Sequence, residues 1–93
     1  MLLSKIKVIG RSMDPTIKNN QLILASSIPF CFRKPKVGEV VVLKKNKFII
    51  KRITRINKDR FFVEGDNKKE STDSRNFGWI SKSEIVGKMI LKI

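Results

Sequence analysis

The feature that most limits the fold of this chain is a series of short, β-branched and apolar segments, each followed by a turn. These segments run over residues 2–9, 21–25, 39–43, 48–56, 60–64 and 85–93, and Gly, Pro, Asn and Lys fill the gaps. Val, Ile, Phe and Thr favour strands, whereas Gly, Pro and Asn favour turns. We find no convincing helical stretch and no internal repeat. The pattern predicts an all-β fold, a small and partly open β-barrel or sandwich.

Two longer connections are expected to be irregular. Residues 27–35 carry two prolines and an apolar cluster at 28–32 that looks exposed, and residues 65–77 are mostly polar. A chain of 93 residues has room for one hydrophobic core but not for two. We therefore expect residues 1–93 to form a single domain.

The chain is strongly basic, with 21 Lys and Arg against 8 Asp and Glu and a formal charge of +13. A field of this size attracts polyanions, and nucleic acid and anionic membranes are the obvious candidates. A solvated basic surface without a partner would give the same composition. The charge alone therefore leaves all three interpretations open.

The residues that are missing restrict the chemistry further. The chain has no histidine and a single cysteine, Cys31. This composition excludes a Ser-His-Asp triad, a Cys-His nucleophile, an internal disulfide and a multi-cysteine zinc site. We expect no metal and no cofactor, and a serine nucleophile here would need a lysine or a carboxylate as its base.

Ser12 is the candidate nucleophile. It lies in a turn over residues 10–16, where Gly10 tolerates unusual backbone angles and Pro15 stiffens the exit. A turn of this kind can present a hydroxyl to a substrate. The backbone N–H of Ser12, with the Gly10 region beside it, is the expected donor to an oxyanion.

Lys51 is the candidate base, because it lies inside the apolar run of residues 48–53. A lysine in water titrates near ~10.4 and is charged at neutral pH, but burial disfavours the ammonium form. Met13 is expected to cover the Ser12–Lys51 pair. The alternative is that Lys51 simply faces solvent from a half-buried strand. The adjacent Arg52 points to the other face of the strand and is expected to pair with an aspartate, Asp66 or Asp73.

Four segments in this order resemble the motif boxes of type I signal peptidases, namely residues 10–16, 35–42, 51–53 and 65–78. The resemblance implies an all-β catalytic core and a serine endopeptidase with a Ser–Lys dyad. It also implies cleavage of leader or signal peptides after small residues, without a metal or cofactor. By position, Ser12 would be the nucleophile and Lys51 the general base. Ser71 would orient the lysine, and Asp73 and Arg75 would form an ion pair that supports the site.

We expect the chain to depart from this family in three respects. Gly10 stands where many members have a serine whose hydroxyl helps the oxyanion hole, and residues 53–64 leave no room for a large accessory β domain. The N-terminal membrane anchor that members usually carry is also not expected here. The chain also resembles the short maturation proteases of the same superfamily, including those that trim the leader of nickel-type superoxide dismutase. A bare catalytic core is therefore expected.

No segment of the sequence is long and apolar enough to span a bilayer. We therefore expect a membrane-associated or cytoplasmic protein whose membrane contact is peripheral or provided by a partner. The apolar cluster at residues 28–32, next to a basic surface, is the expected contact with an anionic bilayer.

Three other interpretations remain open. A self-cleaving repressor-type protease also uses a serine and a lysine on a β-rich fold, but no DNA-binding helical segment precedes the site. An inactive relative would fit the Gly10 substitution, although both candidate catalytic residues are present. A basic β-barrel could bind nucleic acid by stacking, but most of the phenylalanines lie in apolar runs, which favours core packing over nucleic-acid binding. The stacking candidates would be Phe30, Phe32, Phe48, Phe61 and Phe62.

Overall fold

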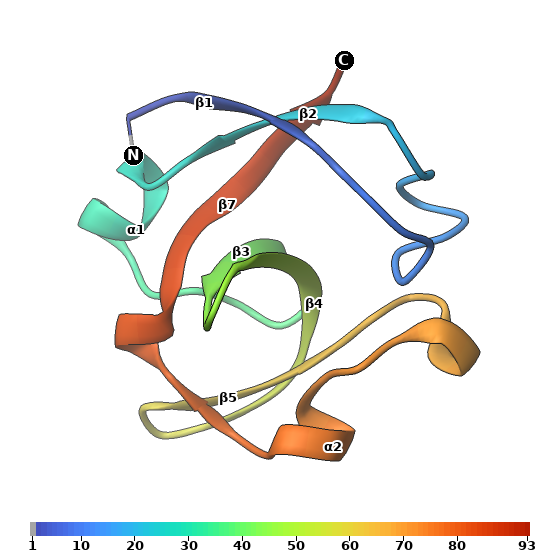
Figure 1. Cartoon of the computed structure of the whole chain (residues 1–93). Coiled ribbons are helices and arrows are strands. Elements are labelled where there is room, and N and C mark those ends of the chain that lie inside the picture. The colour runs from blue at the N-terminus through green and yellow to red at the C-terminus, as the bar shows by residue number, and fades with distance from the viewer. Residues whose placement is uncertain (1) are drawn as a thin grey trace.

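The computed structural model describes residues 2–93, and within them seven strands form one antiparallel sheet that curls on itself (Figure 1). The strand order is β1-β2-β7-β3-β4-β5-β6. The all-β prediction is therefore confirmed. The strands are β1 (Ser4–Lys7), β2 (Leu22–Ser26), β3 (Val40–Lys44), β4 (Phe48–Asn57), β5 (Arg60–Glu64), β6 (Ile80–Ser81) and β7 (Ile85–Lys92).

Four short helical segments lie between the strands of the described chain, where the sequence indicated none. The expectation of an irregular connection at 27–35 is wrong for α1 (Ile28–Phe32), because Pro29 lies in the first helical turn, where a missing N–H costs nothing. Asp73 caps α2 (Ser74–Phe77) through a capping box with Asn76. The others are the 3₁₀ turns η1 (Lys68–Glu70) and η2 (Lys82–Glu84).

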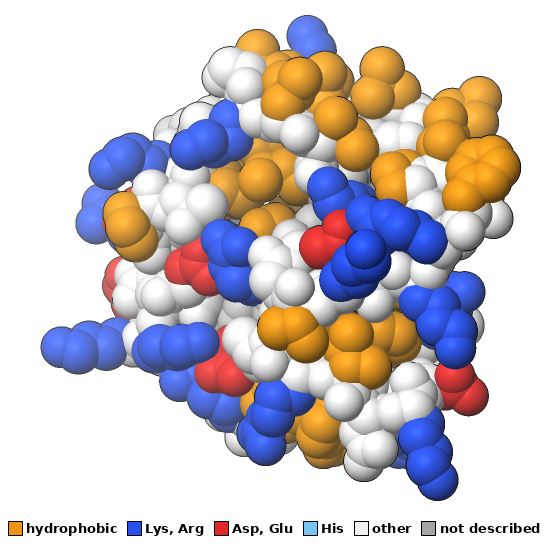
Figure 2. Space-filling view, turned by 180° about the vertical axis from the view of Figure 1, so that it is seen from behind, with side chains coloured by type: hydrophobic (Ala, Val, Ile, Leu, Met, Phe, Trp, Pro, Cys, Tyr) orange, Lys and Arg blue, Asp and Glu red, His pale blue; other side chains and the backbone are white. Residues whose placement is uncertain are grey.

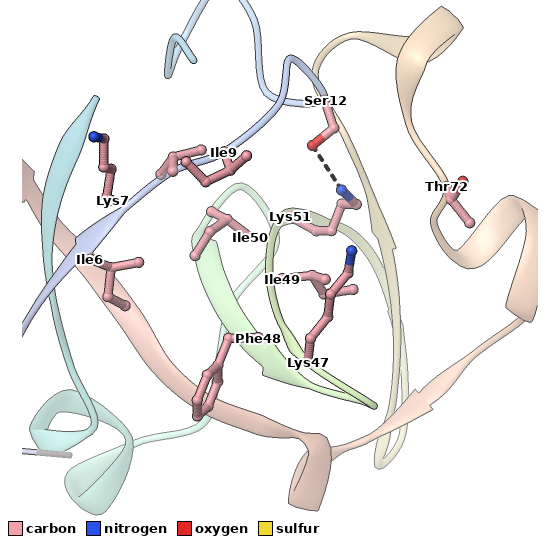
Figure 3. Close-up of a pocket in the computed structure, with 11 residues that line it drawn as sticks. Ile6, Lys7, Ile9, Ser12, Lys47, Phe48, Ile49, Ile50, Lys51 and Thr72 are labelled. Atoms are coloured by element: carbon pink, nitrogen blue, oxygen red, sulfur yellow. Dashed lines mark hydrogen bonds between the residues drawn. The ribbon is translucent and has the colours of Figure 1, made fainter. Parts of the chain in front are cut away.

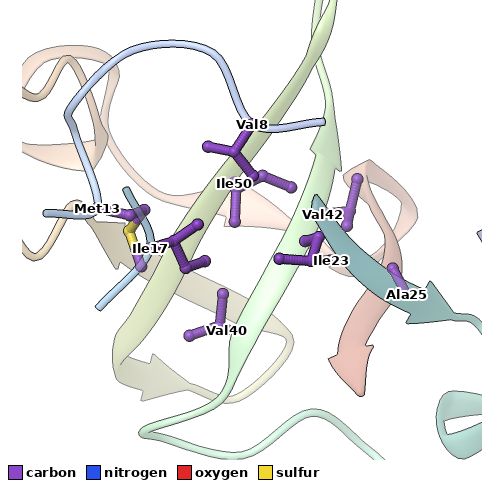
Figure 4. Close-up of a cluster of buried hydrophobic side chains, with 8 residues drawn as sticks. All are labelled: Val8, Met13, Ile17, Ile23, Ala25, Val40, Val42 and Ile50. Carbon is purple, nitrogen blue, oxygen red and sulfur yellow. The ribbon is translucent and has the colours of Figure 1, made fainter. Parts of the chain in front are cut away.

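The curled sheet buries side chains on both of its faces, and the β3–β4 pair lies between two clusters. Val42 and Ile50, which are cross-strand partners, belong to one cluster, and Val41 belongs to the other. This alternation is what a central strand requires. Figure 4 shows the first cluster, which contains Val8, Met13, Ile17, Ile23, Ala25, Val40, Val42 and Ile50. The second contains Val41, Leu43, Ile53, Phe61, Val63 and Ile80.

Strand β4 is longer than either of its partners, and this leaves one of its edges open. Its first half pairs with β3 from Phe48 to Arg52, and β5 pairs only with its second half, from Arg52 to Asn57. Residues 48–51 therefore have a strand on one side only. Strand β1 is the first in the sheet order and has a second free edge. Backbone N–H and C=O groups on such edges are available to another extended chain.

Candidate active site

Ser12 and Lys51 meet although they are 39 positions apart in the chain. Lys51 Nζ donates a hydrogen bond to Ser12 Oγ over 2.9 Å (Figure 3). Ser12 lies in the turn after β1, and Lys51 lies in the middle of β4. Only 5% of the Lys51 surface is exposed, so the amine is held in a largely dehydrated position.

The serine turn is fixed to the core by its apolar residues. Met13 and Ile17 are almost completely buried in the first cluster, and the Ile17 N–H donates to the Met13 carbonyl over 2.9 Å. Met13 is not among the residues that line the cleft beside Ser12. Its buried position anchors the turn from the inside, and its cover of the Ser12–Lys51 pair stays a prediction.

A loop after β5 holds the backbone of the same turn. The Asn67 N–H donates to the Ser12 carbonyl over 2.9 Å, and the Asn67 side-chain amide donates to the Arg11 carbonyl over 3.0 Å. Two bonds from one residue fix both the position and the direction of the turn. The Ser12 hydroxyl is thus presented on a rigid support.

Asp66 ties this loop to β4. Arg52 donates two hydrogen bonds of 2.9 Å to the Asp66 carboxylate, which confirms the expected ion pair, and Thr16 Oγ1 donates a third of 2.6 Å. Arg52 also donates to the Gly38 carbonyl over 2.7 Å. The hydrogen bonds from Arg52 lower the pKa of Asp66, so the carboxylate stays ionised.

Asp73 is the second anchor and is completely buried. Burial alone would raise the pKa of Asp73, but hydrogen bonds from Arg75, the Gly65 N–H and Ser71 outweigh this effect and hold the pKa well below its ordinary value. Arg75 Nε donates over 2.9 Å and Ser71 Oγ over 2.7 Å. The Ser71 hydroxyl therefore bonds to Asp73 in this structure and does not bond to Lys51.

The charge state of Lys51 follows from its surroundings. Burial is the largest effect and lowers the pKa of Lys51 below its ordinary value. The negative charge of Asp73 acts in the opposite direction, and the positive charge of Lys47 lowers the pKa further. The net shift is downward, which favours the neutral amine.

A cleft of about 410 Å³ opens beside the pair. One wall is formed by residues of β1 and the segment after it, and the other by the first half of β4, so the two free strand edges face the same space. The lining residues are Ile6, Lys7, Val8, Ile9, Ser12, Lys47, Phe48, Ile49, Ile50, Lys51 and Thr72.

The backbone N–H of Ser12, with the Gly10 region beside it, was expected to serve an oxyanion site. The Gly10 N–H donates to Asn19 Oδ1 over 2.8 Å and is therefore occupied. The Ser12 N–H has no hydrogen-bond acceptor among residues 2–93 and lies next to the Ser12 hydroxyl. Of the two, the Ser12 N–H is the available donor.

Residues 2–93 contain no group of three or more His, Cys, Asp or Glu side chains arranged to hold a metal ion. Within the same part of the chain, no helix has the length and apolar composition needed to cross a bilayer.

Sequence reasoning missed several residues that build the site. Thr16 and Asn67 secure the serine turn, while Thr72 and Lys47 line the cleft. Their contacts join segments that are up to 56 positions apart. The hydroxyl and amide groups at residues 16 and 67 gave no local sign of a partner at such a distance. Lys47 had a detectable signal, since it shares a strand face with Lys51.

Comparisons with known proteins agree on one family. The family model described as "Signal peptidase, peptidase S26" matches residues 1–56 and 47–93. Mitochondrial inner membrane protease subunit 1 of Homo sapiens is 31% identical over 90% of this chain, and the protein of the same name from Xenopus tropicalis is 29% identical over 90%. A mitochondrial ATP-independent inner membrane protease subunit 1a from Arabidopsis thaliana is 29% identical over 99%. The chain spans 65% of the length of the first two relatives and 71% of the third.

The tight packing around Gly65 generates a first prediction. A Cβ atom at Gly65 would lie 2.3 Å from Ser71 Oγ and 2.5 Å from the Ser12 carbonyl oxygen, so the serine turn or the Gly65 loop must move. We expect Gly65→Ala to lower the free energy of unfolding by about 1–3 kcal/mol, as overpacking typically does. Urea denaturation followed by fluorescence measures the change.

Gly38→Ala is the matched control for Gly65→Ala. A Cβ at Gly38 meets nothing within 4 Å, and only its positive φ of 96° carries a cost. A loss of stability in Gly65→Ala no larger than that in Gly38→Ala would contradict the predicted clash.

Proposed function

The chain belongs to the signal peptidase family, peptidase S26, and we propose on this basis that it is a serine endopeptidase with Ser12 as nucleophile and Lys51 as general base. The observation that carries the proposal is the contact of 2.9 Å between Lys51 Nζ and Ser12 Oγ in a position where the lysine is buried. A serine hydroxyl needs an adjacent base, and a lysine serves as one only when its amine is neutral. With histidine missing from the sequence, the adjacent lysine is the group that can take this role.

The first chemical step transfers the Ser12 proton to the neutral amine of Lys51. Ser12 Oγ forms a bond to the carbonyl carbon of the substrate, and the electron pair of the C=O bond moves to its oxygen. The Ser12 N–H, which has no acceptor among residues 2–93, would donate a hydrogen bond to this oxyanion. The ammonium of Lys51 then gives its proton to the leaving nitrogen as the C–N bond breaks.

The resulting acyl-enzyme is an ester of Ser12. Lys51, neutral again, accepts a proton from a water molecule that attacks the ester carbonyl. Collapse of the second tetrahedral intermediate returns this proton to Ser12 Oγ and releases the carboxyl product. Both half-reactions use the same amine, so one buried lysine supplies acid and base in turn.

Ser71, Asp73 and Arg75 support this pair indirectly. The negative charge of Asp73 raises the pKa of Lys51, which works against a neutral base. The Arg75 guanidinium, 2.9 Å from Asp73, offsets that charge, and Ser71 and Gly65 satisfy the remaining acceptor positions of the carboxylate. Asp73 can therefore fix the loop beside Ser12 without keeping Lys51 protonated.

The substrate is proposed to bind as an extended segment in the cleft. The free edge of β1 and the unpaired first half of β4 both border this space, and each can form backbone hydrogen bonds to a peptide. Ile49 and Ile50 contribute apolar side chains to the lining of the cleft near Lys51. Such a wall is compatible with small side chains near the scissile bond, as in leader and signal peptides of precursor proteins.

The relatives are named as inner membrane proteases, and we propose that this chain also contacts a membrane, peripherally, through α1. Phe32 is 84% exposed and Ile28 is 45% exposed, and Arg33, Lys34 and Lys36 follow directly. Apolar side chains beside basic ones suit an anionic bilayer. Basic side chains also dominate over acidic ones on the face seen in Figure 2. Phe30, in contrast, packs against the second core cluster and does not serve this contact.

Burial removes two of the five candidates for stacking on nucleic-acid bases. Phe61 and Phe62 are 3% and 9% exposed, so their rings cannot stack on bases, whereas Phe32 and Phe48 are 84% and 56% exposed. The aromatic platform that nucleic-acid binding would need is therefore incomplete.

The dyad predicts a pH profile and two inactive variants. Cleavage of a leader peptide with small residues at the scissile bond should rise with pH through the pKa of Lys51, below that of a free lysine, because only the neutral amine accepts the proton. Ser12→Ala and Lys51→Ala should each reduce kcat/KM by roughly 10³-fold or more. Lys58→Ala, which removes an exposed lysine in the β4–β5 turn, is the control and should cleave normally. Normal cleavage by Lys51→Ala would refute the base assignment.

The membrane contact is tested by charge substitution on α1. We expect Phe32→Glu to reduce co-sedimentation with vesicles of phosphatidylglycerol and phosphatidylcholine by about tenfold, because a buried Phe contributes about 1.5–3 kcal/mol. Ile56→Glu introduces the same charge at another exposed apolar position, which is 38% exposed, and should have a smaller effect. Equal losses for both variants, or none for Phe32→Glu, would rule out α1 as the contact.

A further inference from the structure

The cleft beside Ser12 is lined by basic side chains but by no acidic ones. Lys7, Lys47 and Lys51 are among the residues that line it, and none of the lining residues is an aspartate or a glutamate. Within residues 2–93, six basic side chains outside the cleft form ion pairs with carboxylates, whereas Lys7 and Lys47 in the cleft form none. Positive charge without an acidic partner therefore lines the space where a substrate would bind.

Lys47 is the residue best placed to use this charge. Lys47 precedes β4, and the alternation of side chains along an extended chain puts it on the same face as Ile49 and Lys51. Figure 3 shows its amine pointing toward the end of the cleft where Lys51 lies. The two ammonium groups are close enough that Lys47 lowers the pKa of Lys51. A charge that acts on the base also acts on a bound peptide.

We propose that Lys47 is a specificity-determining residue, which selects substrates with an acidic side chain near the scissile bond. This inference rests on the proposed function, because it assigns the cleft to the substrate. A carboxylate in the cleft would replace the missing partner of Lys47, with Lys7 at the opposite wall adding to the attraction. An ion pair in a partly dehydrated cleft is worth more than one in open solvent.

The acidic side chain has to lie closer to Lys47 than to Lys51. A carboxylate next to the Lys51 amine would favour the ammonium form and thereby remove the base. Four positions of extended chain separate the two lysines, a span of about 13 Å between their backbones. The preferred position is therefore a few residues from the scissile bond, beside the first half of β4.

A series of fluorogenic leader peptides tests the proposal. Each position within four residues of the scissile bond is changed, one at a time, to Glu or to Gln. We expect Glu to exceed Gln in kcat/KM by about fivefold at one or two adjacent positions, which corresponds to an ion pair of about 1 kcal/mol. The advantage should disappear in Lys47→Gln, and Lys47→Glu should prefer a lysine at the same position.

Lys58→Gln separates the local effect from the overall charge. It changes the net charge by the same amount as Lys47→Gln but lies in the β4–β5 turn, outside the cleft. The Glu advantage should remain in Lys58→Gln. In addition, Lys47→Gln should raise the midpoint of the pH profile of kcat/KM, because it removes a charge that lowers the pKa of Lys51. An advantage that is absent at every position, or that survives in Lys47→Gln, would overturn the proposal.

A binding measurement distinguishes a failure of the Lys47 proposal from a failure of the proposed peptidase function. If no peptide is cleaved, the proposed function fails, but Ser12→Ala can still be titrated with the same labelled peptides by fluorescence anisotropy. Tighter binding of the Glu peptides, lost in Ser12→Ala/Lys47→Gln, would support an acidic ligand for the cleft. Equal binding of Glu and Gln peptides would overturn it.

Discussion

The contact between a buried lysine amine and a serine hydroxyl is the interaction on which the rest of the site depends. Dehydration disfavours the charged ammonium form of Lys51 and thereby lowers its pKa. A lysine amine becomes useful as a base near neutral pH only when its pKa is lowered in this way. The pKa of Lys51 stays low only if its surroundings remain apolar and the nearest negative charge is compensated. Ile49 and Ile50 meet the first condition, and the Arg75–Asp73 ion pair meets the second.

The fold provides this environment by combining a rigid turn with an incomplete sheet. Asn67 and Asp66 fasten the serine turn from one side, while Met13 fastens it from the core. Because β5 pairs with only the second half of β4, the strand that carries Lys51 keeps a free edge beside the Ser12–Lys51 pair. The excess length of β4 thus places Lys51 next to a strand edge that is open to another extended chain.

Local patterns predicted much of this arrangement. The β-branched runs predicted six of the seven strands to within a few residues but missed the two-residue strand β6. The apolar setting of Lys51 left a buried amine as one of two interpretations, and the structure has Lys51 buried. Helix α1 was missed because two prolines suggested a loop, although one of them occupies a helical first turn. The bond from Ser71 to Asp73 and the role of Asn67 depend on loop conformation. Loop conformation is set by distant partners, which a sequence pattern does not contain.

The central claim is that Lys51 is neutral when the enzyme works, and the most direct test is to titrate this one amine. NMR of protein with ¹³C-labelled lysine follows each Cε signal with pH, and Lys51→Met identifies the signal of Lys51 by its loss. We predict one signal that titrates well below the ordinary lysine value of about 10.4. If the signal of Lys51 titrates together with those of the exposed lysines, the amine is charged at working pH, and the Ser12–Lys51 dyad cannot operate as described.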